Sequence, residues 1–179
     1  MLNEIEKILI SEEEIKEKIK TLAKRLDNDY AGKNPLFVCV LKGSVFFTAD
    51  LVRELTIPAF LDFMSVSSYG AGTISTGELN IKKDLSENIE NRHVIIVEDI
   101  IDTGNTLYKL KNLLLKRNPA SIKIIALLDN PERRTAPMEA DYVGFVIPDE
   151  FVIGYGLDYD ERFRELKDVC VLSRSVYEK

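Results

Sequence analysis

The sequence contains little of what several large classes of protein require. It has one histidine and two cysteines among 179 residues. A zinc site built from cysteine and histidine is not expected, because His93 has no suitable neighbours and is predicted to lie in a surface turn. Cys39 and Cys170 both lie in apolar runs, which indicates small buried side chains rather than a disulfide.

Long apolar runs and an excess of positive charge are also missing. No run approaches the length of a membrane span, and the acidic N-terminal residues are unlike a signal peptide. The 24 basic and 30 acidic residues give a net charge of -6, which disfavours binding to nucleic acid or to anionic membranes. We therefore expect a cytoplasmic protein with neither nucleic acid nor a membrane as a partner.

The chain length fits one domain, covering residues 1–179. Ser11 and Glu14 form a capping-box pattern before a predicted helix that ends near Gly32. Strands and helices then alternate, which predicts an α/β fold with a mostly parallel twisted sheet flanked by helices. The predicted strands cover 36–41, 58–66, 78–83, 94–97, 122–128, 142–147 and 169–172, and the further helices 45–55 and 106–116. Residues 67–76 are rich in serine, threonine and glycine, which predicts a mobile loop or lid.

The most informative stretch is VIIVEDIIDTGNTL, residues 94–107. An apolar run is followed by Glu98 and Asp99, then by Asp102 and small residues, and then by a helical pattern. This order predicts a buried parallel strand, a loop and a helix start, and ligands of such sheets bind beyond the carboxyl ends of the strands. Small residues at a helix start suit a phosphate, and the acids suit ribose hydroxyls, a hydrated metal or a cationic transition state. Alternatively, Asp102 or Thr103 is simply the helix N-cap.

This stretch resembles the phosphoribosyl pyrophosphate signature of the type I phosphoribosyltransferases, and the chain resembles the hypoxanthine–guanine phosphoribosyltransferases. The segments LKGS, VSSYG, IPDEF and GYGLDY extend the resemblance over nearly the whole chain. It implies a type I phosphoribosyltransferase-like fold with a small hood subdomain and a flexible lid loop. It also implies magnesium-dependent phosphoribosyl transfer from phosphoribosyl pyrophosphate to hypoxanthine or guanine, giving IMP or GMP and pyrophosphate in purine salvage. Members of the family assemble as homodimers or homotetramers.

The resemblance also assigns roles to individual residues. The 5′-phosphate is assigned to Thr103, Gly104, Asn105 and Thr106. Glu98 and Asp99 are assigned to the ribose, and these two acids with Asp158 to metal. Pyrophosphate is assigned to Lys42, Gly43 and Arg164, in a loop that related enzymes often hold in a cis conformation at Lys42–Gly43. Ser44 stands where the family pattern has glycine.

The remaining roles concern the base and the lid. Asp102 is the candidate general base, made a better proton acceptor by neighbouring negative charge. Phe151 is expected to stack on the purine and Val152 to offer backbone groups to its edge, while Ser68 and Tyr69 belong to the lid.

One position departs from the family. Asn130 stands where relatives carry a lysine that donates to the 6-oxo group of the purine. Its amide can still donate, but it is neutral and shorter, so we expect weaker or broader use of 6-oxopurines. Three alternatives stay open: transfer to another base such as xanthine, a phosphoribosyl-pyrophosphate-sensing regulatory protein on the same fold, and an interaction module that has lost activity through Asn130.

Overall fold

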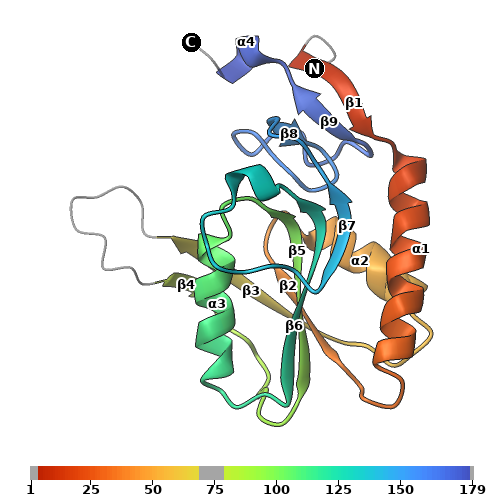
Figure 1. The fold of residues 1–179 in the computed structure, drawn as a ribbon, viewed down its shortest axis with the longest axis vertical. Coiled ribbons are helices and arrows are strands. Elements are labelled where there is room, and N and C mark those ends of the chain that lie inside the picture. The colour runs from red at the N-terminus through yellow and green to blue at the C-terminus, as the bar shows by residue number, and fades with distance from the viewer. Residues whose placement is uncertain (1–3, 69–78, 178–179) are drawn as a thin grey trace.

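The computed structural model describes residues 4–68 and 79–177, and its centre is a six-stranded sheet (Figure 1). The strand order is β4-β3-β2-β5-β6-β7. All neighbours pair in parallel except β3 and β4, so the predicted mostly parallel sheet is confirmed. The strands are β2 Leu36–Val40, β3 Phe60–Ser68, β4 Leu79–Lys83, β5 His93–Ile101, β6 Ser121–Asp129 and β7 Tyr142–Val146.

Helices cover both faces of this sheet (Figure 1). Helices α1 (Glu12–Asp29) and α2 (Val45–Glu54) pack on the face that includes Ile95 and Val97, and α3 (Asn105–Leu115) packs on the face that includes Val94 and Ile96. Successive strand side chains point to opposite faces, and here both faces are buried. This explains why β5 begins as a continuous apolar run. In the part of the chain that the structure describes, no helix is long and apolar enough to cross a membrane.

Helix α1 begins where the capping box predicted. The Ser11 hydroxyl accepts from the Glu14 backbone N–H at 3.3 Å, and the Ser11 N–H donates to the Glu14 carboxylate at 2.8 Å. Buried Ile15, Ile19 and Leu22 then repeat at helical spacing along the face that contacts the sheet.

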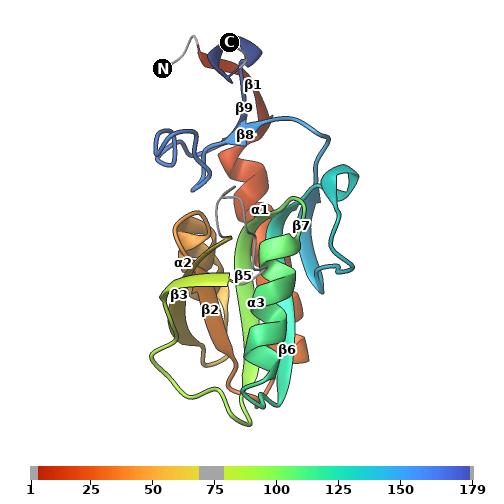
Figure 2. The same ribbon diagram turned by 90° about the vertical axis from the view of Figure 1, so that its left-hand side faces the viewer.

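A second, three-stranded antiparallel sheet forms the hood. Its order is β1-β9-β8, from β1 (Ile5–Ile10), β9 (Val169–Leu172) and β8 (Val152–Ile153), and the short helix α4 (Arg174–Tyr177) follows. Both views show the hood at one end of the molecule, beyond the main sheet (Figures 1 and 2). The strand β1 is absent from the sequence-based prediction.

Two local predictions are wrong, and so is the alternative that Asp102 or Thr103 is the N-cap of α3. The acids Glu98 and Asp99 do not follow a strand but lie within it, because pairing with β6 continues to Ile101. The N-cap of α3 is Gly104, with a left-handed φ of 76°, and neither Asp102 nor Thr103 takes this role. His93 is not in a surface turn but is the half-buried first residue of β5, with Nδ1 2.8 Å from the Ser121 hydroxyl.

The predicted lid lies mostly outside the described residues. Ser68 is the last residue of β3 and pairs with Leu79, so the strand continues beyond its predicted end. Tyr69 belongs to residues 69–78, which the structure does not describe.

Candidate active site

A cavity of about 260 Å³ lies between the carboxyl ends of β5 and β6 and the hood. It brings together most residues that the sequence assigned to base, metal and catalysis. Its lining residues are Asp99, Ile100, Asp102, Asn130, Arg133, Glu150, Phe151, Val152, Leu157 and Asp158.

A smaller cavity of about 180 Å³ adjoins it at the start of α3. It is lined by Glu98, by 100–106 and by Leu107, and it shares Ile100 and Asp102 with the first cavity. Glu98 and Asp99 thus open to different cavities, as expected for neighbours in a strand. The first turn of α3 leaves backbone N–H groups without helical partners, which makes this cavity suited to an anion.

Arg134 holds the loop that follows β5, which contributes residues to both cavities. Its guanidinium donates to the carbonyl oxygens of Ile101, Asp102 and Met138 at 3.2, 3.0 and 3.0 Å, and it forms a close ion pair with Asp129. Arg134 is not among the site residues predicted from the sequence. The one available signal is an arginine pair shortly after a buried strand, and arginine can hold several acceptors at once.

Burial and mutual repulsion act on the paired acids. Burial, together with the charge of Asp99, raises the pKa of Glu98 well above its usual range. Burial raises the pKa of Asp99 to about 6, although its Oδ1 accepts from the Ile100 N–H at 2.7 Å. A nearby cation would stabilise the ionised forms of these two buried carboxyl groups, so the end of β5 favours a cationic ligand.

The carboxylates of the larger cavity suit a metal ion that binds together with a phosphorylated substrate. Among the described residues no group of three acidic, histidine or cysteine side chains converges as a metal site. Asp99 and Asp158 nevertheless line one cavity, and the charge of Asp158 contributes to the raised pKa of Asp99. Magnesium is commonly held by one or two carboxylates together with substrate phosphates, so these residues fit it.

The loop after β2 contacts the acids directly. A β-carbon at Gly43 would overlap the Asp99 carboxylate, and one at Gly156 would overlap the Gly43 carbonyl group. The loop contains a cis peptide between Leu41 and Lys42, one bond before the expected position. Ser44 is fully buried, and its hydroxyl donates to the Val40 carbonyl at 2.8 Å, so the departure from glycine leaves no unpaired polar group.

Lys42 and Arg164 meet at a shared carboxylate. The Glu161 Oε2 lies 2.9 Å from the Lys42 Nζ and 3.4 Å from Arg164 Nη2. Hydrogen bonds from Lys42 and Arg164 lower the pKa of Glu161. Arg164 also pairs with Asp158 at 2.8 Å and donates to the Gly156 carbonyl at 2.7 Å. Two cations from distant segments therefore already surround one anionic group.

Three acceptor oxygens of the larger cavity are buried without a hydrogen-bond partner among the described residues. They are Asp102 Oδ1, Asn130 Oδ1 and Glu150 Oε2. Unpaired buried acceptors are costly, and a ligand with N–H donors would satisfy them. The other oxygen of Asp102 pairs with Arg133 Nη1 at 3.1 Å, so a cation offsets the negative surroundings expected for Asp102.

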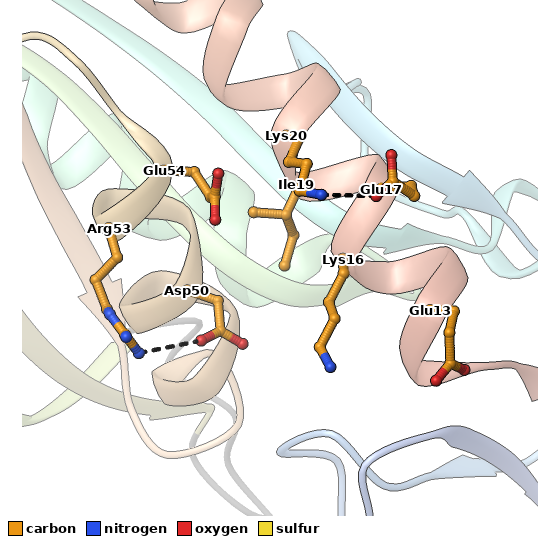
Figure 3. A pocket seen from close by; sticks show the side chains of 8 residues that line it. All are labelled: Glu13, Lys16, Glu17, Ile19, Lys20, Asp50, Arg53 and Glu54. Atoms are coloured by element: carbon orange, nitrogen blue, oxygen red, sulfur yellow. Dashed lines mark hydrogen bonds and ion pairs between the residues drawn. The ribbon is translucent and has the colours of Figure 1, made fainter.

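The hood supplies the apolar side of this cavity. The Phe151 ring lines it and stacks on Tyr177, with ring centroids 5.1 Å apart, while Tyr159 contacts the same ring edge-on at 5.6 Å. Val152, in β8, is buried beside it. A separate cavity of about 400 Å³ between α1 and α2 contains none of the predicted site residues, and two ion pairs, Lys20–Glu17 and Arg53–Asp50, lie among its lining side chains (Figure 3).

The fold and these two adjoining cavities define an α/β protein with a candidate ligand site, suited to an anion, beyond the carboxyl ends of its strands. The family model of the phosphoribosyl transferase domain matches residues 7–160, and the chain belongs to this family. The type I phosphoribosyltransferase fold inferred from the sequence is thereby confirmed.

Relatives match nearly the whole chain. It is 52% identical over 176 residues to the hypoxanthine-guanine phosphoribosyltransferase of Streptococcus thermophilus, covering 98% of both chains. A crystal structure of a hypoxanthine phosphoribosyltransferase from Staphylococcus aureus matches with a TM-score of 0.96 and 47% identity, over 100% of this chain and 97% of that one. A mutant hypoxanthine phosphoribosyltransferase from Trypanosoma cruzi, in a ternary complex with substrates, matches with a TM-score of 0.92 and 49% identity, over 98% and 99% of the two chains. The predicted resemblance is confirmed.

Proposed function

We propose that this enzyme transfers the phosphoribosyl group of phosphoribosyl pyrophosphate to a 6-oxopurine, hypoxanthine or guanine, in purine salvage. The observation that carries the proposal is the position of Asp102 in both adjoining cavities. A base in the larger cavity and a 5′-phosphate in the smaller one would place the ribose carbon that reacts between them. The close relatives that are named for this activity support the same choice.

The reaction forms a bond between a ring nitrogen of the purine and the anomeric carbon of the ribose, as the bond from that carbon to pyrophosphate breaks. The purine nitrogen must lose a proton. Asp102 Oδ1 is buried in the base cavity without a partner among the described residues, and it accepts this proton. The electron pair of the broken bond leaves with pyrophosphate.

The smaller cavity holds the 5′-phosphate. The first backbone N–H groups of α3 and the hydroxyls of Thr103 and Thr106 bind it, with Asn105 beside them. Gly104 adopts the left-handed backbone that opens the helix at this point. Glu98 and Asp99 stabilise the positive charge that develops on the ribose ring, because a nearby cation favours the ionised forms of these two buried acids.

Lys42 and Arg164 bind the pyrophosphate in place of the Glu161 carboxylate, and Gly43, which has no β-carbon, lets the loop lie directly against the Asp99 side chain. Magnesium would be held by Asp99 and Asp158, with Glu98 nearby in the strand, and would neutralise pyrophosphate as it leaves. Phe151 and Val152 bind the purine ring opposite Asn130. Ser68 and Tyr69 stay assigned to a lid that excludes water.

The comparisons favour none of the three alternatives, which are a regulatory protein, an interaction module and a transferase for xanthine. The direct test is pyrophosphate release with magnesium and phosphoribosyl pyrophosphate, offering hypoxanthine, guanine, xanthine, adenine and uracil in parallel. Turnover fastest with hypoxanthine or guanine supports the proposal. Turnover only with another base would reassign the cavity, and binding of phosphoribosyl pyrophosphate without turnover would favour the regulator.

Three broader proposals accompany this function. The whole of 1–179 forms one phosphoribosyltransferase domain. The cytoplasm is supported by two free, buried cysteines. Homodimers or homotetramers are supported by the exposed Val45 and Phe46 at the start of α2, and mass measurement in solution tests this.

A further inference from the structure

Arg133 is the only cationic side chain that lines the larger cavity among the described residues. It ends the 3₁₀ helix Pro131–Arg133, which directly follows Asn130. Its Nη1 lies 3.1 Å from Asp102 Oδ2 and its Nε lies 3.7 Å from Asp149 Oδ1. Its side chain is 49% exposed, whereas that of Arg134 is 13% exposed and is held by backbone carbonyl groups. Arg133 can therefore adjust to a ligand, and Arg134 cannot.

The other polar side chains that line the cavity do not prefer an oxo group to an amino group. Asn130 is only 2% exposed, and its amide offers both a donor and an acceptor. It can face either a 6-oxo group or a 6-amino group by exchanging the two ends of its amide. Asp102 and Glu150 present unpaired acceptor oxygens, which favour a ligand rich in donors. These groups alone would accept adenine as readily as hypoxanthine.

We propose that Arg133 determines the preference for 6-oxopurines, by donating to the 6-oxo group in the position that a longer cationic side chain at residue 130 would otherwise fill. A guanidinium has five donors and no acceptor, so it binds an oxo group and rejects an amino group. This inference rests on the proposed function and adds to it the residue that selects the base.

The geometry lets Arg133 do this without leaving Asp102. A guanidinium presents its donors as a planar fork, and one Arg133 side chain can reach two neighbouring acceptors. Nη1 is the atom that contacts Asp102, and Nη2 is the second donor group of the same fork. Nη2 is the donor that the purine oxygen would accept from, while Asp102 Oδ1 faces the ring nitrogen.

The test is steady-state kinetics of the full chain with magnesium, saturating phosphoribosyl pyrophosphate, and hypoxanthine, guanine or adenine. Arg133→Gln replaces a donor-only group with an amide. Its KM for hypoxanthine should rise by about 10- to 100-fold, as expected for loss of one hydrogen bond to a charged donor. The ratio of kcat/KM for hypoxanthine to that for adenine should fall with it. Arg133→Lys keeps a donor-only cation, so it should retain the preference for hypoxanthine even where its KM rises.

The double variant Asn130→Lys with Arg133→Gln should restore both KM and preference, because it returns a donor-only cation to the same cavity. A merely structural role of Arg133 would not be rescued in this way. Arg117→Gln is the matched control, since Arg117 pairs with Asp84 at 2.8 Å outside the cavity, and its kinetics should equal those of the wild type.

The outcomes separate the inference from the function. Wild-type turnover of hypoxanthine, combined with an unchanged KM and unchanged preference in Arg133→Gln, would overturn the inference alone. Failure of the lysine at 130 to restore the preference would also overturn it, provided that the double variant melts at the wild-type temperature. Absence of wild-type turnover with any 6-oxopurine would overturn the proposed function and the inference together.

Discussion

Burial disfavours the ionised form of Asp99, so Asp99→Asn should stabilise the ligand-free protein at pH 8. The same substitution should impair the use of magnesium and phosphoribosyl pyrophosphate. Burial raises the pKa of Asp99 from 3.8 to about 6, and the same charge raises the pKa of Glu98. Asparagine has nearly the same shape, and its carbonyl oxygen can keep accepting from the Ile100 N–H. The substitution therefore removes the charge and little else.

The sign and size of this change in stability follow from the pKa of Asp99 in the unfolded chain and its pKa in the folded protein. The folded protein holds this proton more tightly than the unfolded chain does, so the contribution to the free energy of unfolding is fully present below pH 3.8 and is lost as pH rises through about 6. The difference corresponds to about 3 kcal/mol at most. Because Asp99 is partly open to solvent in its cavity, we expect about 1–2 kcal/mol at pH 8, or roughly 2–8 °C in Tm.

The assay is thermal unfolding of wild type and Asp99→Asn at pH 5 and pH 8 without metal, followed by pyrophosphate release with magnesium. The stabilisation should be largest at pH 8 and should fall to about half of that value at pH 5, because pH 5 lies between the pKa of Asp99 in the unfolded chain and its pKa in the folded protein. Asp84→Asn is a control with the opposite expected change in stability. Hydrogen bonds from Arg117 lower the pKa of Asp84, so loss of the Asp84 charge should destabilise the protein at pH 8. An Asp99→Asn variant that melts at or below the wild-type temperature at pH 8 would refute the reasoning.

Three further substitutions test the assigned roles through steady-state kinetics. Asp102→Asn should lower kcat by about 100-fold or more while binding of phosphoribosyl pyrophosphate changes little, and equal loss in both would remove Asp102 as the general base. Glu161→Gln should lower the KM for phosphoribosyl pyrophosphate by about 2- to 5-fold, because it frees Lys42 from an exposed ion pair, whereas a higher KM would show that Glu161 assists binding. Gly43→Ala should raise the same KM by about 10-fold or more, since its methyl group would overlap Asp99, and a wild-type KM would contradict the close contact at the loop.

The main sheet could be predicted because its strands are buried on both faces and so form continuous apolar runs. Strand β1 could not, because its sequence IEKILI mixes charged and apolar residues, and its partner β9 lies at the far end of the chain. The end of β5 was misplaced for a similar reason. Glu98 and Asp99 stay in the strand because β6 pairs alongside them, which the local sequence does not show.

Site residues that lie together in the chain were predictable as a group. The segment after Asp102, to which the 5′-phosphate is assigned, is one example, since most residues that line the smaller cavity belong to it. Arg133, Arg134 and Glu161 were missed because their roles come only from partners far away in the sequence, such as the ion pair between Arg133 and Asp102. As isolated residues they have the pattern of ordinary surface charges.

The most direct test of the central claim is mass-spectrometric identification of the product formed from hypoxanthine, phosphoribosyl pyrophosphate and magnesium. The proposed transfer predicts a nucleoside monophosphate that carries the purine on the ribose carbon, in amounts equal to the pyrophosphate released. The Asp102→Asn variant should form it far more slowly. Pyrophosphate released with ribose phosphate but without a nucleotide, or no product while phosphoribosyl pyrophosphate binds, would contradict the claim.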